Sequence, residues 1–291
     1  MGSRLPLVGM LIAIEVVIAG FAIYTLTGHR TIFAGTGGGG FHSMNYTAPP
    51  VAPVAVGNAP TIAIDDPSDR VIVTVSNDRF VHVVDRTRMS GMFWGMPQVA
   101  PLHVSRTADG VSIVRGAENM FISLGDDGST RRIEVQVPSD AVLSIAQCGG
   151  AEITGTQGGV TAHSVDGSIL LADLRGTVDV RDDDGRIEAR RITGDSFGAR
   201  SSDGRIILDG VIAPKIDVNT LDGRIIATFP ANTDATITAR TDDGNIRRDG
   251  TQLNHGDGDV AVQTITLGSG AGRVALATND GTIYISTNGA N

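Results

Sequence analysis

The sequence predicts an all-β fold, a stacked β-solenoid-like or β-helix-like repeat domain with about nine plus nine residues per repeat, preceded by one N-terminal transmembrane helix. Three observations lead to this prediction. Glycines recur every nine residues in the second half of the chain, Asp-Gly pairs recur there every 18 to 21 residues, and residues 5–27 are almost wholly apolar. We therefore divide the chain into a membrane segment, a linker and one β domain.

The overall composition favours strands over helices. The chain of 291 residues holds 38 glycines, and 41% of its residues are hydrophobic. Many of these are Val and Ile, which fit strands, while glycine suits turns. The net charge is −9 with both signs interspersed, so no basic stripe indicates a nucleic-acid partner. The single cysteine, Cys148, excludes an internal disulfide framework, and we expect it to be a small core residue.

Residues 5–27 predict a membrane-spanning helix. An apolar run of about 20 residues matches the hydrocarbon thickness of a bilayer and exceeds the usual core of a signal peptide, although a cleaved signal peptide stays the alternative. Arg4 and Arg30 flank the run and nearly cancel the positive-inside bias. The Gly- and Pro-rich linker, 28–60, leads to a domain suited to export. We expect an inner-membrane anchor with the C-terminal domain in the periplasm or outside the cell.

Glu15 lies near the middle of the predicted helix. An ionisable side chain at this depth commonly contacts another helix or takes part in proton transfer, and the alternative is a protonated carboxyl tolerated by a very apolar helix. Glu15 is therefore a candidate contact to a membrane partner. It also makes an envelope-stress sensor or regulator, acting through this helix, the alternative function.

The repeat itself begins near residue 148. Most of its glycines are followed two residues later by Val or Ile, which predicts one turn with a positive φ at glycine and one short strand per nonapeptide. Every second turn carries Asp before Gly, so two strands form one unit, and units of this kind stack and bury their apolar faces against each other. The nine-residue spacing holds at Gly149, Gly158, Gly167, Gly176, Gly185 and Gly194, and Gly204 follows after ten.

The segment before the repeat is interpreted as part of the same domain, 61–291. Strand-like runs without fixed spacing occur at 71–76, 80–84, 111–115 and 131–137. We expect residues 61–147 to form an irregular cap on the regular repeats, 148–291, because terminal repeats of stacked folds are atypical. A separate β-sandwich is the alternative.

The repeated Asp-Gly-x-Ile units, at Asp184–Ile187, Asp203–Ile206, Asp222–Ile225 and Asp243–Ile246, and the closing Val274–Ile283 resemble the bacterial putative-adhesin family. These are β-strand-repeat domains of unknown function, related to adhesin-head-like domains. The resemblance covers about 149–286. It implies an all-β, envelope-associated domain on one helical tether, it brings no catalytic residue with it, and the family name implies adhesion.

Motifs that could carry catalysis or metal binding lack their structural context. Gly194–Gly198 spells G-x-S-x-G, but that motif needs a following helix, which does not fit before Gly204. Only His255–Val260 approaches a calcium-binding nonapeptide. A polysaccharide-cleaving β-helix enzyme would need a carboxylate cluster or a basic residue in a groove, and the chain has one lysine, Lys215. We predict no catalytic activity, no cofactor and no metal site.

Arg186, Arg205 and Arg224 follow Asp-Gly pairs at intervals of 19 residues, so stacking would place them in one column beside a column of aspartates. One interpretation is a neutralised, solvated edge whose exposed pairs contribute little. The other is a ligand-facing column that binds an anionic envelope glycan, because guanidinium groups suit carboxylates and phosphates. Another envelope protein is the alternative partner.

The segment Met89–Pro97 combines loop-forming ends with Met, Phe and Trp. It predicts either a loop that covers the open end of the stack or a contact surface. Taken with the anchor and the repeat, this leads us to expect a non-catalytic, membrane-anchored envelope protein for adhesion, ligand binding or scaffolding.

Overall fold

The computed structural model describes residues 41–94, 99–116, 122–124, 130–256 and 259–288. The predicted transmembrane helix and Glu15 lie outside these ranges. No helix among the described residues has the length and apolar character needed to cross a membrane, and their regular structure consists of strands. The all-β prediction is therefore confirmed for the part of the chain that the structure describes.

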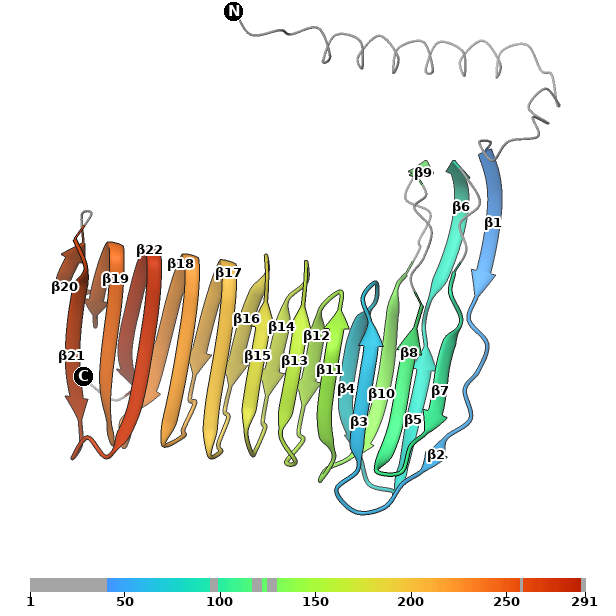
Figure 1. Cartoon of the computed structure of the whole chain (residues 1–291), viewed down its shortest axis with the longest axis horizontal. Coiled ribbons are helices and arrows are strands. Elements are labelled where there is room, and N and C mark those ends of the chain that lie inside the picture. The colour runs from blue at the N-terminus through green and yellow to red at the C-terminus, as the bar shows by residue number, and fades with distance from the viewer. Residues whose placement is uncertain (1–40, 95–98, 117–121, 125–129, 257–258, 289–291) are drawn as a thin grey trace, which may run out of the picture.

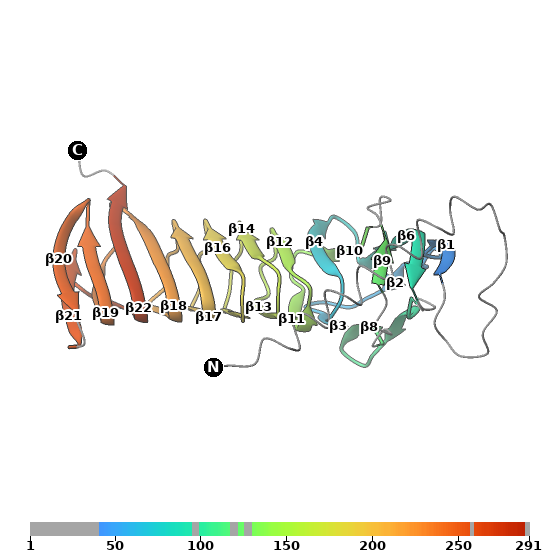
Figure 2. The same cartoon turned by 90° about the horizontal axis from the view of Figure 1, so that it is seen from above.

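The strands form a long rod with two layers, and each strand runs across the rod axis (Figure 1, Figure 2). The first layer contains, in spatial order, β7 (Leu102–Arg106), β8 (Gly110–Arg115), β3 (Thr61–Asp66), β11 (Val142–Cys148), β13 (Val160–Ser164) and β15 (Val178–Asp182). The second contains β2 (Val54–Ala55), β5 (Phe80–Asp85), β10 (Arg132–Pro138), β4 (Arg70–Ser76), β12 (Ala151–Thr154), β14 (Ile169–Ala172) and β16 (Arg186–Arg190).

Four long strands continue both layers. They are, in spatial order, β17 (Ser196–Asp209), β18 (Lys215–Pro230), β22 (Gly272–Asn288) and β19 (Ala235–Arg248). Two antiparallel strands on β19, namely β21 (Ala261–Leu267) and β20 (Thr251–Gly256), end the first and second layers. Because the long strands join the layers, these 19 strands form one sheet that wraps around the core. A separate sheet contains β1 (Phe41–Thr47), β6 (Arg88–Trp94) and β9 (Ile122–Leu124).

Neighbouring repeats pair in parallel and in register. Ile187 lies opposite Ile206, and Ile206 lies opposite Ile225. All three are fully buried, because side chains alternate across a strand and every second one points between the layers. Burying an aliphatic side chain of this size contributes about 2–3 kcal/mol, so these columns form the core that holds the rod together.

The predicted turn at each Asp-Gly pair is wrong for the later repeats. β17, β18, β19 and β22 are strands of 14 to 17 residues that run through the pair without interruption. The pair is a bend that carries one strand from the first layer into the second. Among the strands of the regular repeats, β12 to β16 have the short length of four or five residues that the nonapeptide spacing predicts.

The stacking order departs from the chain order at both ends of the rod. β22, the last strand, lies between β18 and β19, since Ile216 opposes Val274 and Ile237 opposes Val274 from the other side. At the opposite end, β8 and β10 lie outside β3 and β4, although they follow them in the chain. Local periodicity carries no information about these insertions, because they join segments that are distant in sequence.

The irregular part of the domain contains the four predicted strands, which are β4, β5, β8 and β10. The parallel ladder extends into it, because β3 pairs with β11 in parallel. Two expectations need correction. Part of the predicted linker forms β1 and β2, and most of the predicted loop Met89–Pro97 forms β6, paired with β1 and β9. Paired residues at least 25 positions apart form these strand pairs, so the local Gly and Pro content did not reveal the strands.

Candidate ligand-binding face

The three predicted arginines stand in one column on the outer surface of the second layer. Arg186 lies opposite Arg205, and Arg205 lies opposite Arg224. All three are exposed. Neighbouring strands are about 4.8 Å apart, so the column runs along the rod axis. We call Arg186, Arg205 and Arg224 the arginine ladder.

Each guanidinium of the ladder has a different environment. Arg186 forms an ion pair with the carboxylate of Glu188, which also pairs with Arg190. The Arg224 guanidinium carbon lies 5.4 Å from the centre of the Tyr284 ring, within the range of a cation–π contact. Arg205 has no ion pair or hydrogen bond among the described residues. The middle of the ladder is therefore free to bind an anion.

An apolar row accompanies the ladder on the same face. Ile207 lies opposite Ile226, and Ile226 lies opposite Tyr284. All three are half-buried. Ile207 and Ile226 come two residues after Arg205 and Arg224, and Tyr284 comes two residues after Thr282, which lies opposite Arg224. The apolar side chains therefore point to the same side of the sheet as the ladder. We call Ile207, Ile226 and Tyr284 the apolar row. The sequence prediction missed it because single outward-facing apolar residues are common on surfaces.

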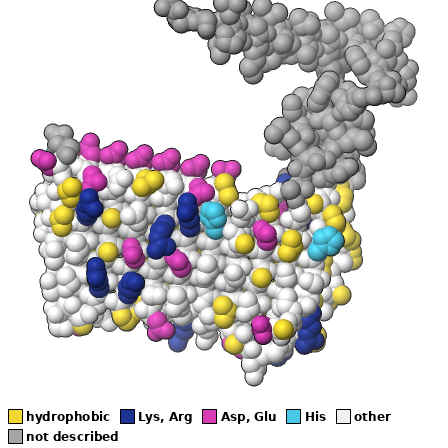
Figure 3. Space-filling view, viewed as in Figure 1, with side chains coloured by type: hydrophobic (Ala, Val, Ile, Leu, Met, Phe, Trp, Pro, Cys, Tyr) yellow, Lys and Arg dark blue, Asp and Glu magenta, His cyan; other side chains and the backbone are white. Residues whose placement is uncertain are grey.

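The aspartates of the Asp-Gly pairs form a second column at the bend, the acidic edge, and they are exposed. Figure 3 shows acidic side chains in a line along one long edge of the rod. None of the arginine-ladder residues makes an ion pair with this edge in the described part of the chain, so the interpretation as a mutually neutralised edge finds no support in the contacts. The register matches Asp203, Asp222, Asp280 and Asp243, and Asp184 precedes them.

Three arginines on the outer face of the first layer are each neutralised by an aspartate, unlike Arg205 of the ladder. Arg181 pairs with Asp183 at 3.1 Å, Arg200 pairs with Asp179 at 2.9 Å, and Arg240 pairs with Asp242 at 2.8 Å. These pairs are exposed and contribute little to stability. Arg181, Arg200 and Arg240 therefore form a comparison set for the arginine ladder, because each of their guanidinium groups is already paired.

A column of buried polar residues lines the inner side of the bend, opposite the acidic edge. We call it the polar spine. Thr278 donates a hydrogen bond to the carbonyl of Asp280, and Thr241 donates one to the carbonyl of Asp243, so the spine satisfies backbone groups where the strand bends. Its members in spatial order are Asp66, Cys148, Ser164, Asp182, Ser201, Thr220, Thr278 and Thr241, all buried.

Cys148 belongs to this spine and is buried, as expected for a lone core cysteine. Burial raises the pKa of its thiol to about 11, which keeps the less reactive thiol form. The spacing contains a signal for the spine, since most of its members stand three residues before the glycine of an Asp-Gly pair. The signal is ambiguous because Ser, Thr and Asp near a turn are ordinarily solvent-exposed.

Asp182 is the one carboxylate in the middle of the spine. Burial, together with the nearby Asp183 and Asp184, raises its pKa to about 7 against the opposing effect of the Ser164 hydroxyl. A carboxyl whose pKa is higher in the folded state than in the unfolded state stabilises the fold most at pH values below its unfolded pKa, where it is protonated in both states. This contribution is lost as the pH rises to the folded-state pKa of about 7. We expect Asp182→Asn to raise the melting temperature at pH 8 and to flatten its dependence on pH between 4 and 7.

The matched control for this prediction is Asp222→Asn, which removes an exposed carboxylate of the acidic edge two strands away from Asp182. It should leave the pH profile of the melting temperature nearly unchanged. A lower melting temperature of Asp182→Asn at pH 8, or a wild-type pH profile in that variant, would contradict the assignment.

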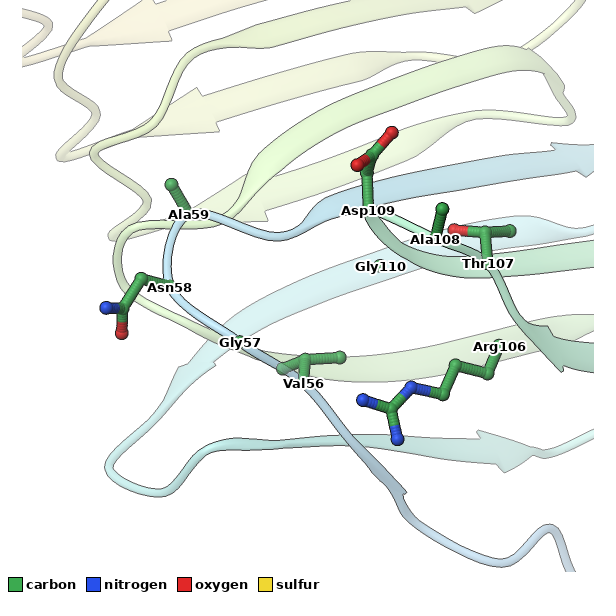
Figure 4. Close-up of a pocket in the computed structure, with 9 residues that line it drawn as sticks. All are labelled: Val56, Gly57, Asn58, Ala59, Arg106, Thr107, Ala108, Asp109 and Gly110. Atoms are coloured by element: carbon green, nitrogen blue, oxygen red, sulfur yellow. The ribbon is translucent and has the colours of Figure 1, made fainter.

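Neither of two cavities in the described part of the chain gathers catalytic groups. One, of about 210 Å³, lies between residues 56–59 and 106–110 (Figure 4). In Figure 4 the Arg106 guanidinium extends toward Val56, while the Asp109 carboxylate points away from it. The other, of about 500 Å³, lies near the start of β22 and is lined mainly by apolar side chains such as Val211, Ile212 and Val274.

The remaining sequence motifs find no partners that would support catalysis or metal binding. β17 begins within Gly194–Gly198, so a strand takes the place of the helix that a nucleophile elbow requires. Residues 257–258 of His255–Val260 lie outside the described ranges. Among the described residues, no three His, Cys, Asp or Glu side chains converge as a metal site would need.

Comparison with known proteins gave two distant structural likenesses. No protein family model matches the chain, and no curated protein does. The chain is similar to the structure of a putative cell adhesion protein from Clostridium sporogenes, with 9% identity, a TM-score of 0.39, and coverage of 86% of this chain and 100% of that one. It is also similar to a putative adhesin from Bacteroides fragilis, with 12% identity, a TM-score of 0.32, and coverage of 86% and 97%.

Proposed function

We propose that this chain is a non-catalytic, membrane-anchored envelope protein whose exported domain binds an anionic envelope polymer along the arginine ladder. The observation that carries this proposal is the ladder itself. Its three guanidinium groups stand in register on an exposed face, and none pairs with the acidic edge in the described part of the chain. Guanidinium groups bind carboxylates and phosphates in a forked geometry.

The geometry supports a polymer that lies along the rod and crosses the strands. Successive ladder positions are about 4.8 Å apart, so one extended polymer would meet Arg186, Arg205 and Arg224 in turn. The apolar row would contact the less polar faces of the polymer, and Tyr284 lies beside Arg224. The acidic edge would repel the polymer from the bend and keep it over the second layer.

The rod supports a role in display as well as binding. We infer that the wrapped sheet is a β-solenoid in architecture, because successive repeats from β11 to β18 pair in parallel and in register. The inserted strands at both ends depart from a regular solenoid. With residues 5–27 as the anchor, such a rod would hold the ladder in the periplasm or outside the cell, and adhesion or scaffolding would follow from polymer binding.

The test measures binding of the full chain in detergent to polygalacturonate, with neutral dextran as the uncharged polymer. The wild type should bind polygalacturonate in a salt-sensitive manner, because exposed charges are screened by salt. Replacing Arg186, Arg205 and Arg224 together by Gln should weaken this affinity by about tenfold or more, corresponding to about 1.4 kcal/mol. The melting temperature should change little, since exposed pairs contribute under about 1 kcal/mol.

The matched control replaces Arg181, Arg200 and Arg240 by Gln. It changes the net charge equally, but these arginines are already neutralised by aspartates, so the affinity should stay close to the wild-type value. Equal losses in both triple variants, or no salt-sensitive binding by the wild type, would refute the proposal.

A further inference from the structure

The rod ends in a strand whose hydrogen-bonding edge is open. β21 pairs with β19 on one side only, and no further strand pairs with it in the described part of the chain. It lies at the opposite end of the rod from β1 (Figure 1). An unpaired strand edge is a template for another strand.

The register identifies the backbone groups on this edge. The Gly272 amide donates to the Asp234 carbonyl at 3.0 Å, so the even-numbered residues of β19 bond to β22 and the odd-numbered ones bond to β21. Ile237 therefore exchanges hydrogen bonds with Ile265, its partner in the register. The N–H and C=O groups of Val262, Thr264 and Thr266 consequently point to the open edge.

Two side-chain amides already bond to this edge, which agrees with the assignment. Asn254 donates to the Val262 carbonyl at 3.1 Å, and Gln263 donates to the Thr264 carbonyl at 3.1 Å. Both contacts are exposed and involve flexible side chains. A pairing strand could displace them at low cost, since the displaced amides would bond to water.

The side chains of this end favour association rather than preventing it. Ala261–Leu267 contains no charge, no proline and no glycine, and most of its residues have high strand propensity, which is the composition of self-pairing segments. Three exposed apolar side chains surround the edge, Leu253, Val260 and Val262, with exposed fractions of 40%, 54% and 48%.

At the opposite end of the rod, the two end strands of the 19-stranded sheet are protected in the usual ways. There β2 is only two residues long and follows Pro53, and β7 is a five-residue strand that ends in Arg106. Short strands, proline and charge at an edge prevent strand addition. Within the 19-stranded sheet, this contrast favours pairing of the β21 end with a like end over pairing with β2 or β7.

We propose that β21 pairs with β21 of a second copy of this chain, in antiparallel orientation about a twofold axis at Thr264, and joins two rods end to end. Rotation by 180° about an axis perpendicular to the layers reverses the direction of the strands. It also places the first layer of one copy edge to edge with the first layer of the other copy, and likewise for the second layers. The same rotation brings β20 beside β20 of the second copy. One symmetry operation thus closes both open edges, as expected for an isologous dimer.

The decisive variant is Thr264→Pro in the full chain, solubilised in detergent. The Thr264 amide points to the open edge, so proline removes two symmetry-related hydrogen bonds of the dimer and none of the monomer, and edge positions tolerate proline. We expect a dimer by light scattering for the wild type, at least a tenfold weaker dimer for Thr264→Pro, and an unchanged dimer for Thr264→Ala, which keeps the amide. All three should have similar circular dichroism.

Cross-linking locates the contact. Thr264→Cys should form an oxidised dimer in membranes, because Cα atoms opposite each other across an antiparallel pair are about 4.5–5.5 Å apart, within disulfide range. Asn219→Cys, on the outer face of the first layer, should not, and buried Cys148 gives the wild-type background. A monomeric wild type, or a dimer that survives Thr264→Pro without cross-linking at position 264, would overturn the proposal.

Discussion

Replacing Gly185 by alanine is expected to destabilise the domain by about 3 kcal/mol, the upper end of the usual cost of overpacking, because no space exists for a side chain at this position. A Cβ atom there would lie 1.9 Å from the carbonyl oxygen of Gly167 and 2.1 Å from the Asp182 carboxylate. The closest obstacle is the backbone of the neighbouring repeat, which cannot rotate away as a side chain would. Chemical unfolding followed by circular dichroism measures the loss.

The reason for this sensitivity differs from the sequence prediction, which assigned it to a positive φ. Gly185 is not among the glycines with a left-handed backbone. It belongs to a column in which each added Cβ would meet the backbone oxygen of the adjacent glycine. The distances are 2.3 Å at Gly167, 2.1 Å at Gly204, 2.0 Å at Gly223, 1.7 Å at Gly281 and 1.8 Å at Gly244.

The matched control is Gly57→Ala. A Cβ at Gly57 meets no atom within 4 Å, so the same added methyl group should change the free energy of unfolding by no more than about 0.5 kcal/mol. Asp184→Asn, beside the column but exposed, should also be tolerated. Equal losses for the two alanine variants would show that close packing of the glycine column is not what stabilises the stack.

Replacing Arg115 by methionine is expected to cost about 3–5 kcal/mol at neutral pH, because it leaves the buried carboxylates of Asp66 and Asp85 without their counter-charge. The Arg115 side chain is fully buried and lies 3.0 Å from Asp66, 3.1 Å from Asp69 and 2.7 Å from Asp85. It also donates to the Ala100 carbonyl at 2.8 Å. This cluster occupies the end of the polar spine, where β8 adds to β3.

The loss should shrink as the pH falls. Burial raises the pKa of Asp66 even with Arg115 present, and removing the cation removes an effect that lowers it. A protonated carboxyl no longer needs the guanidinium, so the difference between variant and wild type should be smaller at pH 5 than at pH 7.5. Unfolding curves at the two pH values measure this difference.

Arg191→Met serves as the control for the charge cluster. Arg191 forms a forked ion pair with Asp173 at 2.7 and 2.8 Å, but both side chains are largely exposed, so the cost should stay below about 1 kcal/mol at either pH. If Arg115→Met cost no more than Arg191→Met, the buried cluster would not contribute measurably to stability.

The sequence by itself determined the class of the fold and the pairing within the regular repeats. Strand propensity and the alternation of Val and Ile depend only on neighbours along the chain, so the core columns and the arginine ladder followed from a spacing of 18 or 19 residues. The same spacing brings Arg186, Arg205 and Arg224 together in the structure.

Only the tertiary structure decided the order of the strands and the environment of the site. β22 inserts between β18 and β19, and Tyr284 thereby comes to lie against Arg224, a contact between residues 60 positions apart. The Arg115 cluster and the open edge of β21 arise in the same way, from strands that follow no repeat. The physical reason is that periodicity specifies which side of a strand is buried, whereas the partner of a terminal strand depends on which edge is still unpaired when distant segments meet.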